Sequence, residues 1–123
     1  MQPDERDAGY LFDMLQFARE ALAITANTPA EIYLAGLRSR RALERTISLI
    51  GEAANHVSRG FQAEHADIPW SEIIGQRNWL VHGYREIDAK RVLDVVDNRL
   101  PRLIVPLLEL VPPAPADPEP DET

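Results

Sequence analysis

The sequence predicts an all-α fold, namely an antiparallel bundle of four to five helices. Apolar residues recur with the helical spacing of three and four along most of the 123 residues. No apolar–polar alternation persists, and no Asn-Gly or Asp-Gly dipeptide signals a hairpin turn. The length suits one domain with a single core, and 45% apolar and 27% charged residues are typical of a globular chain.

The first helix is predicted over residues 4–24. Apolar residues in this stretch follow helical steps, which places them on one face. This stripe consists of Leu11, Met14, Leu15, Ala18 and Leu22. The pattern predicts that the helix buries one side against the rest of the bundle.

The second helix is predicted over residues 29–59. Thr28 is a good N-cap, Pro29 fits the first helical position, and Glu31 completes a capping box. Gly36 offers a break point between a short and a long piece. The buried face is predicted to hold Leu43, Ile47, Ile50, Ala54 and Val57. Gly60 is expected to end the helix, because glycine is frequent just past helix ends.

The rest of the bundle is predicted as a loop and two more helices. Residues 61–69 form the loop, and a third helix follows over residues 69–83. The fourth helix spans residues 88–110, with Asp88 as its N-cap. Pro101 is expected to kink or split this helix, because proline removes a helix hydrogen bond.

The C-terminal stretch differs from the body in composition. Residues 112–123 are rich in proline and carry four acidic residues and no basic one. We expect a helical domain over residues 1–111 and a disordered acidic tail over residues 112–123. The net charge of −7 argues against passive electrostatic binding to nucleic acid, although the body alone carries only −3.

Several functional classes are excluded or disfavoured by composition. The absence of cysteine excludes a disulfide framework, a thiolate metal site and a cysteine nucleophile. No apolar run approaches the roughly 20 residues of a membrane span. The first residues show no signal-peptide pattern, so a cytoplasmic location without membrane contact is expected.

The main chemical candidates lie in the stretch RNWLVHGY, which holds Arg77, Asn78, His82 and Tyr84. Helical spacing places Asn78 and His82 on one face, and Arg77 about 140° from His82. An arginine can hold a phosphate, and a histidine can transfer a proton near neutral pH. Together they suffice, in principle, for metal-free cleavage of RNA by general acid–base catalysis.

A structural interpretation of the same residues stays open. Arg77 would pair with surface carboxylates, and His82 would sit at the C-terminal end of its helix, where a cation is favoured. The separation of about 140° is also poor geometry for a site within one chain. If the pair is catalytic, a second copy across a two-fold axis could supply the missing reach.

Glu52 and His56 form a second candidate on the second helix. Their spacing of four residues could place two metal ligands on one face. No third ligand is evident, so an ordinary polar pair is the favoured interpretation and no metal is predicted.

The stretch RSRRALER is a third candidate. Arg38, Arg41 and Arg45 share one helix face and could contact phosphates. The alternative is a solvated face whose arginines pair with Glu44 and Glu31.

The stretch IPWSEIIGQRNWLVHGYREID resembles the HEPN superfamily, and specifically its HepT-like toxin branch. That branch carries the motif R-x-x-x-x-H-x-Y, matched by Arg77, His82 and Tyr84, with Asn78 as the usual polar companion of the arginine. The stretches LIGEAANHVS and TPAEIYLA support the resemblance, which spans about residues 4–110.

The resemblance implies a dimeric all-α endoribonuclease that acts as a toxin and needs no metal or cofactor. Arg77 and His82 would be the catalytic pair, supported by Asn78. RNA, rather than DNA, would be cut by attack of its 2′-OH on the adjacent phosphate. The arginines expected at the rim of the cleft are Arg38, Arg41, Arg85 and Arg91.

The resemblance also implies a partner, because the family is usually encoded beside a minimal nucleotidyltransferase antitoxin. That enzyme would transfer AMP from ATP onto Tyr84 and so block the RNase by bulk and negative charge. The homodimer could belong to a higher assembly of dimers. The alternative function is a non-catalytic helical module that binds a nucleotide or the nucleotidyltransferase.

Overall fold

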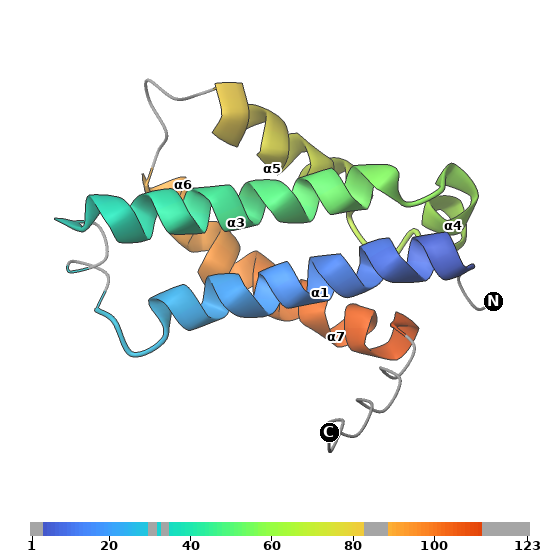
Figure 1. Ribbon diagram of the computed structural model, residues 1–123, viewed down its shortest axis with the longest axis horizontal. Coiled ribbons are helices and arrows are strands. Elements are labelled where there is room, and N and C mark those ends of the chain that lie inside the picture. Colours follow the sequence, from blue (N-terminus) through green and yellow to red (C-terminus); the bar gives the residue numbers. More distant parts are fainter. Residues whose placement is uncertain (1–3, 30–31, 33–34, 83–88, 112–123) are drawn as a thin grey trace, which may run out of the picture.

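The computed structural model describes residues 4–29, 32, 35–82 and 89–111, and every regular element within these ranges is helical (Figure 1). The predicted all-α bundle is confirmed. Helix α3 packs against both α1 and α5, and α7 packs against α1. The elements are α1 (Glu5–Thr25), α3 (Leu37–His56), α4 (Arg59–Glu64), α5 (Trp70–His82), α6 (Ala89–Asp94), the π-helical turn η1 (Val95–Arg99) and α7 (Leu100–Leu110).

Helix α1 lies close to its predicted bounds. Its N-cap is Asp4, whose Oδ1 accepts a hydrogen bond of 2.7 Å from the backbone N–H of Asp7. The predicted stripe faces the core, with Leu11, Met14 and Ala18 fully buried. Figure 1 shows α1 running antiparallel to α3 along most of its length.

Helix α3 begins at the predicted break point but ends earlier than predicted. It starts at Leu37 after the N-cap Gly36, and it ends at His56 rather than at residue 59. Val57 leaves the helix in an extended conformation. The capping role predicted for Glu31 lies outside the described residues.

The prediction that Gly60 ends the second helix was wrong, because Gly60 lies inside α4. Ser58 starts this helix, and its Oγ accepts a hydrogen bond from Phe61 N–H. Asp7, buried in α1, accepts hydrogen bonds from Ser58 N–H at 2.8 Å and from Ser58 Oγ at 2.6 Å. This contact spans 51 positions and holds the junction between α3 and α4 in place.

The predicted loop over residues 61–69 was also partly wrong. Its first four residues complete α4, and Phe61 is buried against the edge of the Trp70 ring. Trp70 donates its indole N–H to the backbone oxygen of His65 at 3.0 Å. These contacts fix the start of α5.

The last helical segment accommodates Pro101 without a break. Leu100 donates its N–H to the carbonyl of Val95, five residues back, in the widened turn η1. In an α-helix, the proline ring clashes with the carbonyl four residues back, and proline has no N–H to donate. The wider turn before Pro101 accommodates both effects. Helical residues therefore continue from α6 into α7.

The described core is a single apolar cluster contributed by all the long helices. Its fully buried large side chains include Leu43, Ile47, Ile50, Val92, Leu100 and Leu107. Among the described residues, no helix is both long and apolar enough to cross a membrane. The predicted tail, residues 112–123, lies outside the described residues.

Candidate active site

Arg77 is fixed at the crossing of α3 and α5. A Cβ atom added to Gly51 of α3 would lie 2.7 Å from the backbone oxygen of Ile73 and 2.8 Å from Cβ of Arg77. Side-chain carbons are essentially never this close, so only glycine permits the contact. The backbone of α3 therefore sets the position from which Arg77 projects.

The side chain of Arg77 is half-buried and available for an anion. Within the described part of the chain, its guanidinium takes part in neither of the ion pairs nor in any side-chain hydrogen bond. The structural interpretation, in which Arg77 pairs with surface carboxylates, gains no support from these residues. A positioned guanidinium without an intramolecular partner can bind a phosphate.

The other motif residues follow along the same helix. Asn78 is exposed on α5, and His82 is the last residue of that helix. The imidazole of His82, and all of Tyr84 and Arg85, lie outside the described residues. The structure therefore places Arg77 and Asn78 and the backbone of His82 on one short helix, while the acid–base role of His82 stays a prediction.

The arginines expected at the cleft differ in their surroundings. Arg38 is exposed near the start of α3. Arg41 forms an ion pair of 3.2 Å with the buried carboxylate of Glu44, as the solvated-face alternative predicts. The guanidinium carbon of Arg91 lies 4.2 Å from the centre of the Trp79 ring on α5. Arg91 thus stands beside the motif helix and supports it.

The Glu52–His56 pair has no third potential metal ligand beside it in the described part of the chain. Among the described residues, no group of three or more histidine or acidic side chains could hold a metal. His56 instead stacks on Tyr10 of α1, with ring centres 5.0 Å apart and an interplanar angle of 16°. The favoured interpretation as an ordinary polar residue pair is consistent with this contact.

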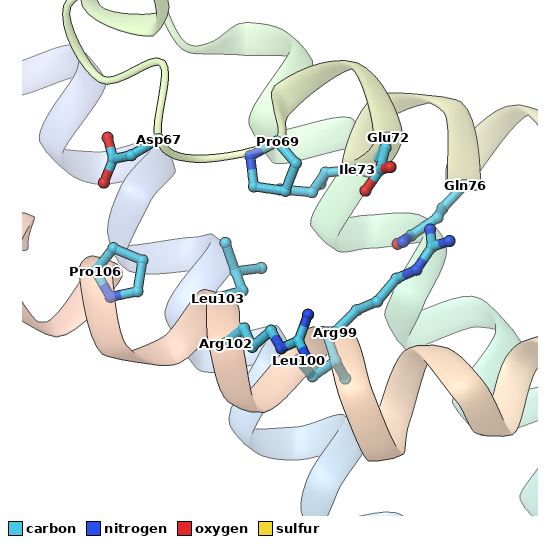
Figure 2. Close-up of a pocket in the computed structure, with 10 residues that line it drawn as sticks. All are labelled: Asp67, Pro69, Glu72, Ile73, Gln76, Arg99, Leu100, Arg102, Leu103 and Pro106. Atoms are coloured by element: carbon cyan, nitrogen blue, oxygen red, sulfur yellow. The ribbon is translucent and has the colours of Figure 1, made fainter.

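A pocket of about 170 Å³ lies on a different side of α5, facing α7. Figure 2 shows Gln76 and Arg99 at one end of the pocket, with Ile73 reaching toward it from α5 and Leu103 from α7. Arg77 does not line this pocket. The motif arginine and this pocket are therefore separate features of one helix.

Sequence reasoning missed two residues that shape this region. Gly51 was not singled out, although a glycine inside a helical pattern beside alanines is a signal of close helix approach. Tyr10 was missed because its partner His56 is distant in the sequence, and no local pattern joins them.

Comparisons with known proteins find relatives over most of this chain. The family model described as "Ribonuclease HepT-like" matches residues 14–109. "Putative RNase MJ1380" of Methanocaldococcus jannaschii is 28% identical over 94 residues, covering 76% of this chain and 86% of its own length. "Putative RNase MJ0127" of the same organism is 24% identical and covers 89% of this chain and 90% of its own length.

A third relative is the protein of Thermococcus cleftensis named "Probable ribonuclease HepT". It is 28% identical over 95 residues, which is 74% of this chain and 86% of its own length. The comparison with solved structures finds no match.

Proposed function

We propose that this chain is an endoribonuclease and the toxin of a toxin–antitoxin pair. The premise is that the chain belongs to the HepT-like ribonuclease family. The family membership confirms the resemblance inferred from the motif. The observation that carries the proposal is the position of Arg77. The Gly51 contact fixes its backbone, and its guanidinium has no partner among the described residues.

The proposed reaction is an internal transfer at one phosphate. The 2′-OH oxygen attacks the adjacent phosphorus and loses its proton, while the bond from phosphorus to the 5′ oxygen breaks and that oxygen gains a proton. The products are a 2′,3′-cyclic phosphate and a 5′-OH. His82 exchanges the protons, and Arg77 stabilises the charge that develops on the phosphate oxygens. Asn78, one residue further along α5, supports the pair.

The proposed site requires two chains. Arg77 and His82 are five residues apart on α5, which corresponds to about 140° around a helix. By this helical spacing, one copy would present the two residues in different directions. A two-fold axis that brings two α5 helices together would complete the cleft, and Arg38, Arg41, Arg85 and Arg91 would line its rim.

Regulation is proposed to act on the same cleft. A nucleotidyltransferase antitoxin would transfer AMP to the Tyr84 hydroxyl, releasing pyrophosphate from ATP. Each AMP adds a bulky group with a negative charge beside the catalytic pair. RNA would then be excluded both by shape and by charge.

The first test replaces the catalytic pair. Arg77→Ala and His82→Ala are each expected to lower the rate of RNA cleavage by on the order of 100-fold or more. Arg19→Ala, an exposed arginine on α1, is the matched control and should cleave normally. Full activity in both motif variants would rule out the proposed mechanism.

The second test concerns Tyr84. The protein is co-expressed with the nucleotidyltransferase encoded beside it, and its intact mass is measured. Additions of AMP units that disappear in Tyr84→Phe would support the regulatory proposal. If the unmodified parent also lacks RNase activity, the non-catalytic binding module becomes the better description.

A further inference from the structure

A second concave surface lies between α1 and α3, on a different side of α3 from the Gly51–Arg77 contact. Its volume is about 310 Å³, and its base is formed by Leu49 and the buried Ala53. Ligand pockets usually begin at about 300 Å³, so this groove is large enough for a small planar group. The pocket beside α7 is smaller, at about 170 Å³.

Aromatic rings stand along the groove. Tyr10 of α1 and His56 of α3 stack on each other, so they stand at the same level of the two antiparallel helices. Phe17 lines the groove two helical turns further along α1, about 10 Å away by helix rise. Leu49 lies at the corresponding level of α3. The ring pair and Phe17 therefore stand at different levels along one apolar base.

Two carboxylates occupy the level between the rings. Asp13 comes three residues after Tyr10 on α1, and Glu52 comes four residues before His56 on α3. Because the helices are antiparallel, these positions lie opposite each other across the groove. Arg45 lines the groove one turn beyond Leu49.

These charged groups keep their hydrogen-bonding capacity. Within the described residues, Asp13, Glu52 and Arg45 take part in neither of the ion pairs nor in any side-chain hydrogen bond. The Glu52–His56 pair and Arg45, one residue of the arginine stripe, thus line a groove that neither sequence pattern predicted. Unpaired polar groups around an apolar base are typical of a ligand site.

We propose that this groove binds a guanine base of single-stranded RNA; the identity of the RNA rests on the proposed function. Carboxylates only accept hydrogen bonds, so they select a ligand edge that carries two adjacent donors. Guanine presents its N1–H and N2–H groups side by side. Adenine and cytosine place an acceptor next to their amino group, and uracil places carbonyls on both sides of its N–H.

The remaining contacts suit the rest of a nucleotide. Aromatic side chains commonly stack on the bases of unpaired RNA, and here the rings of Phe17 or His56 are available. Arg45 can hold the phosphate. A base in the groove would be held close to Glu52, which directly follows Gly51. One strand crossing α3 could therefore reach both the groove and Arg77, and the groove would select the sequence around the cut.

The test uses the full chain and the four mononucleotides GMP, AMP, CMP and UMP as probes in titrations followed by NMR or calorimetry. GMP should bind about tenfold or more tightly than the other three, as expected for one good bidentate contact. The double variant Asp13→Asn with Glu52→Gln should bind GMP no more tightly than AMP. Glu20→Gln, an exposed acid elsewhere on α1, is the matched control and should retain the preference.

Equal binding of the four nucleotides, or an unchanged preference in the double variant, would overturn the proposal. Binding of free arginine with no binding of GMP would do the same, because the groove would then accept a cationic side chain. Circular dichroism confirms that the variants fold, which is expected since both acids are exposed.

Cleavage assays separate this proposal from the proposed function. The substrates are RNAs that each carry one guanine at a different distance from a single cut site. The rate at which the parent protein cuts them should depend on that distance. The double variant should cut them all at similar rates, while its cleavage of a dinucleotide stays unchanged. If the parent protein shows no RNase activity, the proposed function fails but the GMP titration still decides the groove. If RNase activity is present without any guanine preference, only the groove proposal fails.

Discussion

Helix α3 meets its two long neighbours in opposite ways. Toward α5, Gly51 allows the two backbones to touch, and the contact leaves no room even for a methyl group. Toward α1, the stacked rings of Tyr10 and His56 mark the end of a groove of about 310 Å³. The tight contact fixes where a single side chain, Arg77, begins. The groove, at the exposed edge of the α1–α3 contact, leaves space in which a ligand could be held.

The largest difference in the free energy of unfolding is expected between alanine substitutions at two neighbouring residues of α3. Ile50 is 1% exposed in the core, whereas Leu49 is half-buried on the base of the groove. Ile50→Ala should lower the free energy of unfolding by about 2–5 kcal/mol, because it leaves a cavity. Leu49→Ala should cost only about 1 kcal/mol, since its side chain is already partly in water. Urea denaturation measures both, and equal losses would mean that the groove is closed in solution.

The second prediction tests the tight contact itself. Gly51→Ala should lower the free energy of unfolding by up to about 2 kcal/mol, because overpacking costs about 1–3 kcal/mol and the gain in helix propensity offsets about 1 kcal/mol of it. RNA cleavage should fall further than stability alone explains, since Arg77 must shift. Gly9→Ala on α1 is the control: nothing lies within 4 Å of its added Cβ, so it should stabilise the protein. A stabilised Gly51→Ala variant would contradict the close approach of α3 and α5.

The smallest effect concerns the other side of α5, where Arg91 covers Trp79. Arg91→Ala should lower the free energy of unfolding by about 0.5–1 kcal/mol through loss of the cation–π contact. Arg91→Lys should recover part of this loss, because lysine keeps the charge but not the planar group. Thermal unfolding detects the difference. No change in either variant would show that the contact between Arg91 and Trp79 does not stabilise the fold.

The order and type of the helices could be predicted because they depend on local patterns. The apolar stripe of α1 is visible in the sequence, and it appears in the fold. The end of α3 could not be predicted in this way. Glycine is frequent just past helix ends, so Gly60 was expected to follow the second helix. The chain leaves α3 earlier because Ser58 is bound by Asp7, which lies 51 positions away.

The candidate site was only partly predictable for the same reason. A motif identifies Arg77 because its spacing is local. The groove depends on the register between α1 and α3, which brings Tyr10 and His56 together from 46 positions apart. Pro101 was correctly expected to disturb its helix, but the form of the disturbance was not predicted. A π-helical turn precedes the proline, and the helical residues continue through it.

The bond between Asp7 and Ser58 has a consequence for local unfolding. The first turn of an N-terminal helix usually frays, and its amide protons exchange with solvent long before the protein unfolds. Here the first turn of α1 holds the buried Asp7, which accepts two hydrogen bonds from Ser58 at the start of α4, so this turn cannot open alone without breaking both bonds. The amides of Ala8 and Ser58 should therefore exchange slowly and at similar rates. The N-terminal turn then belongs to the same cooperative unit as the helices that carry the site.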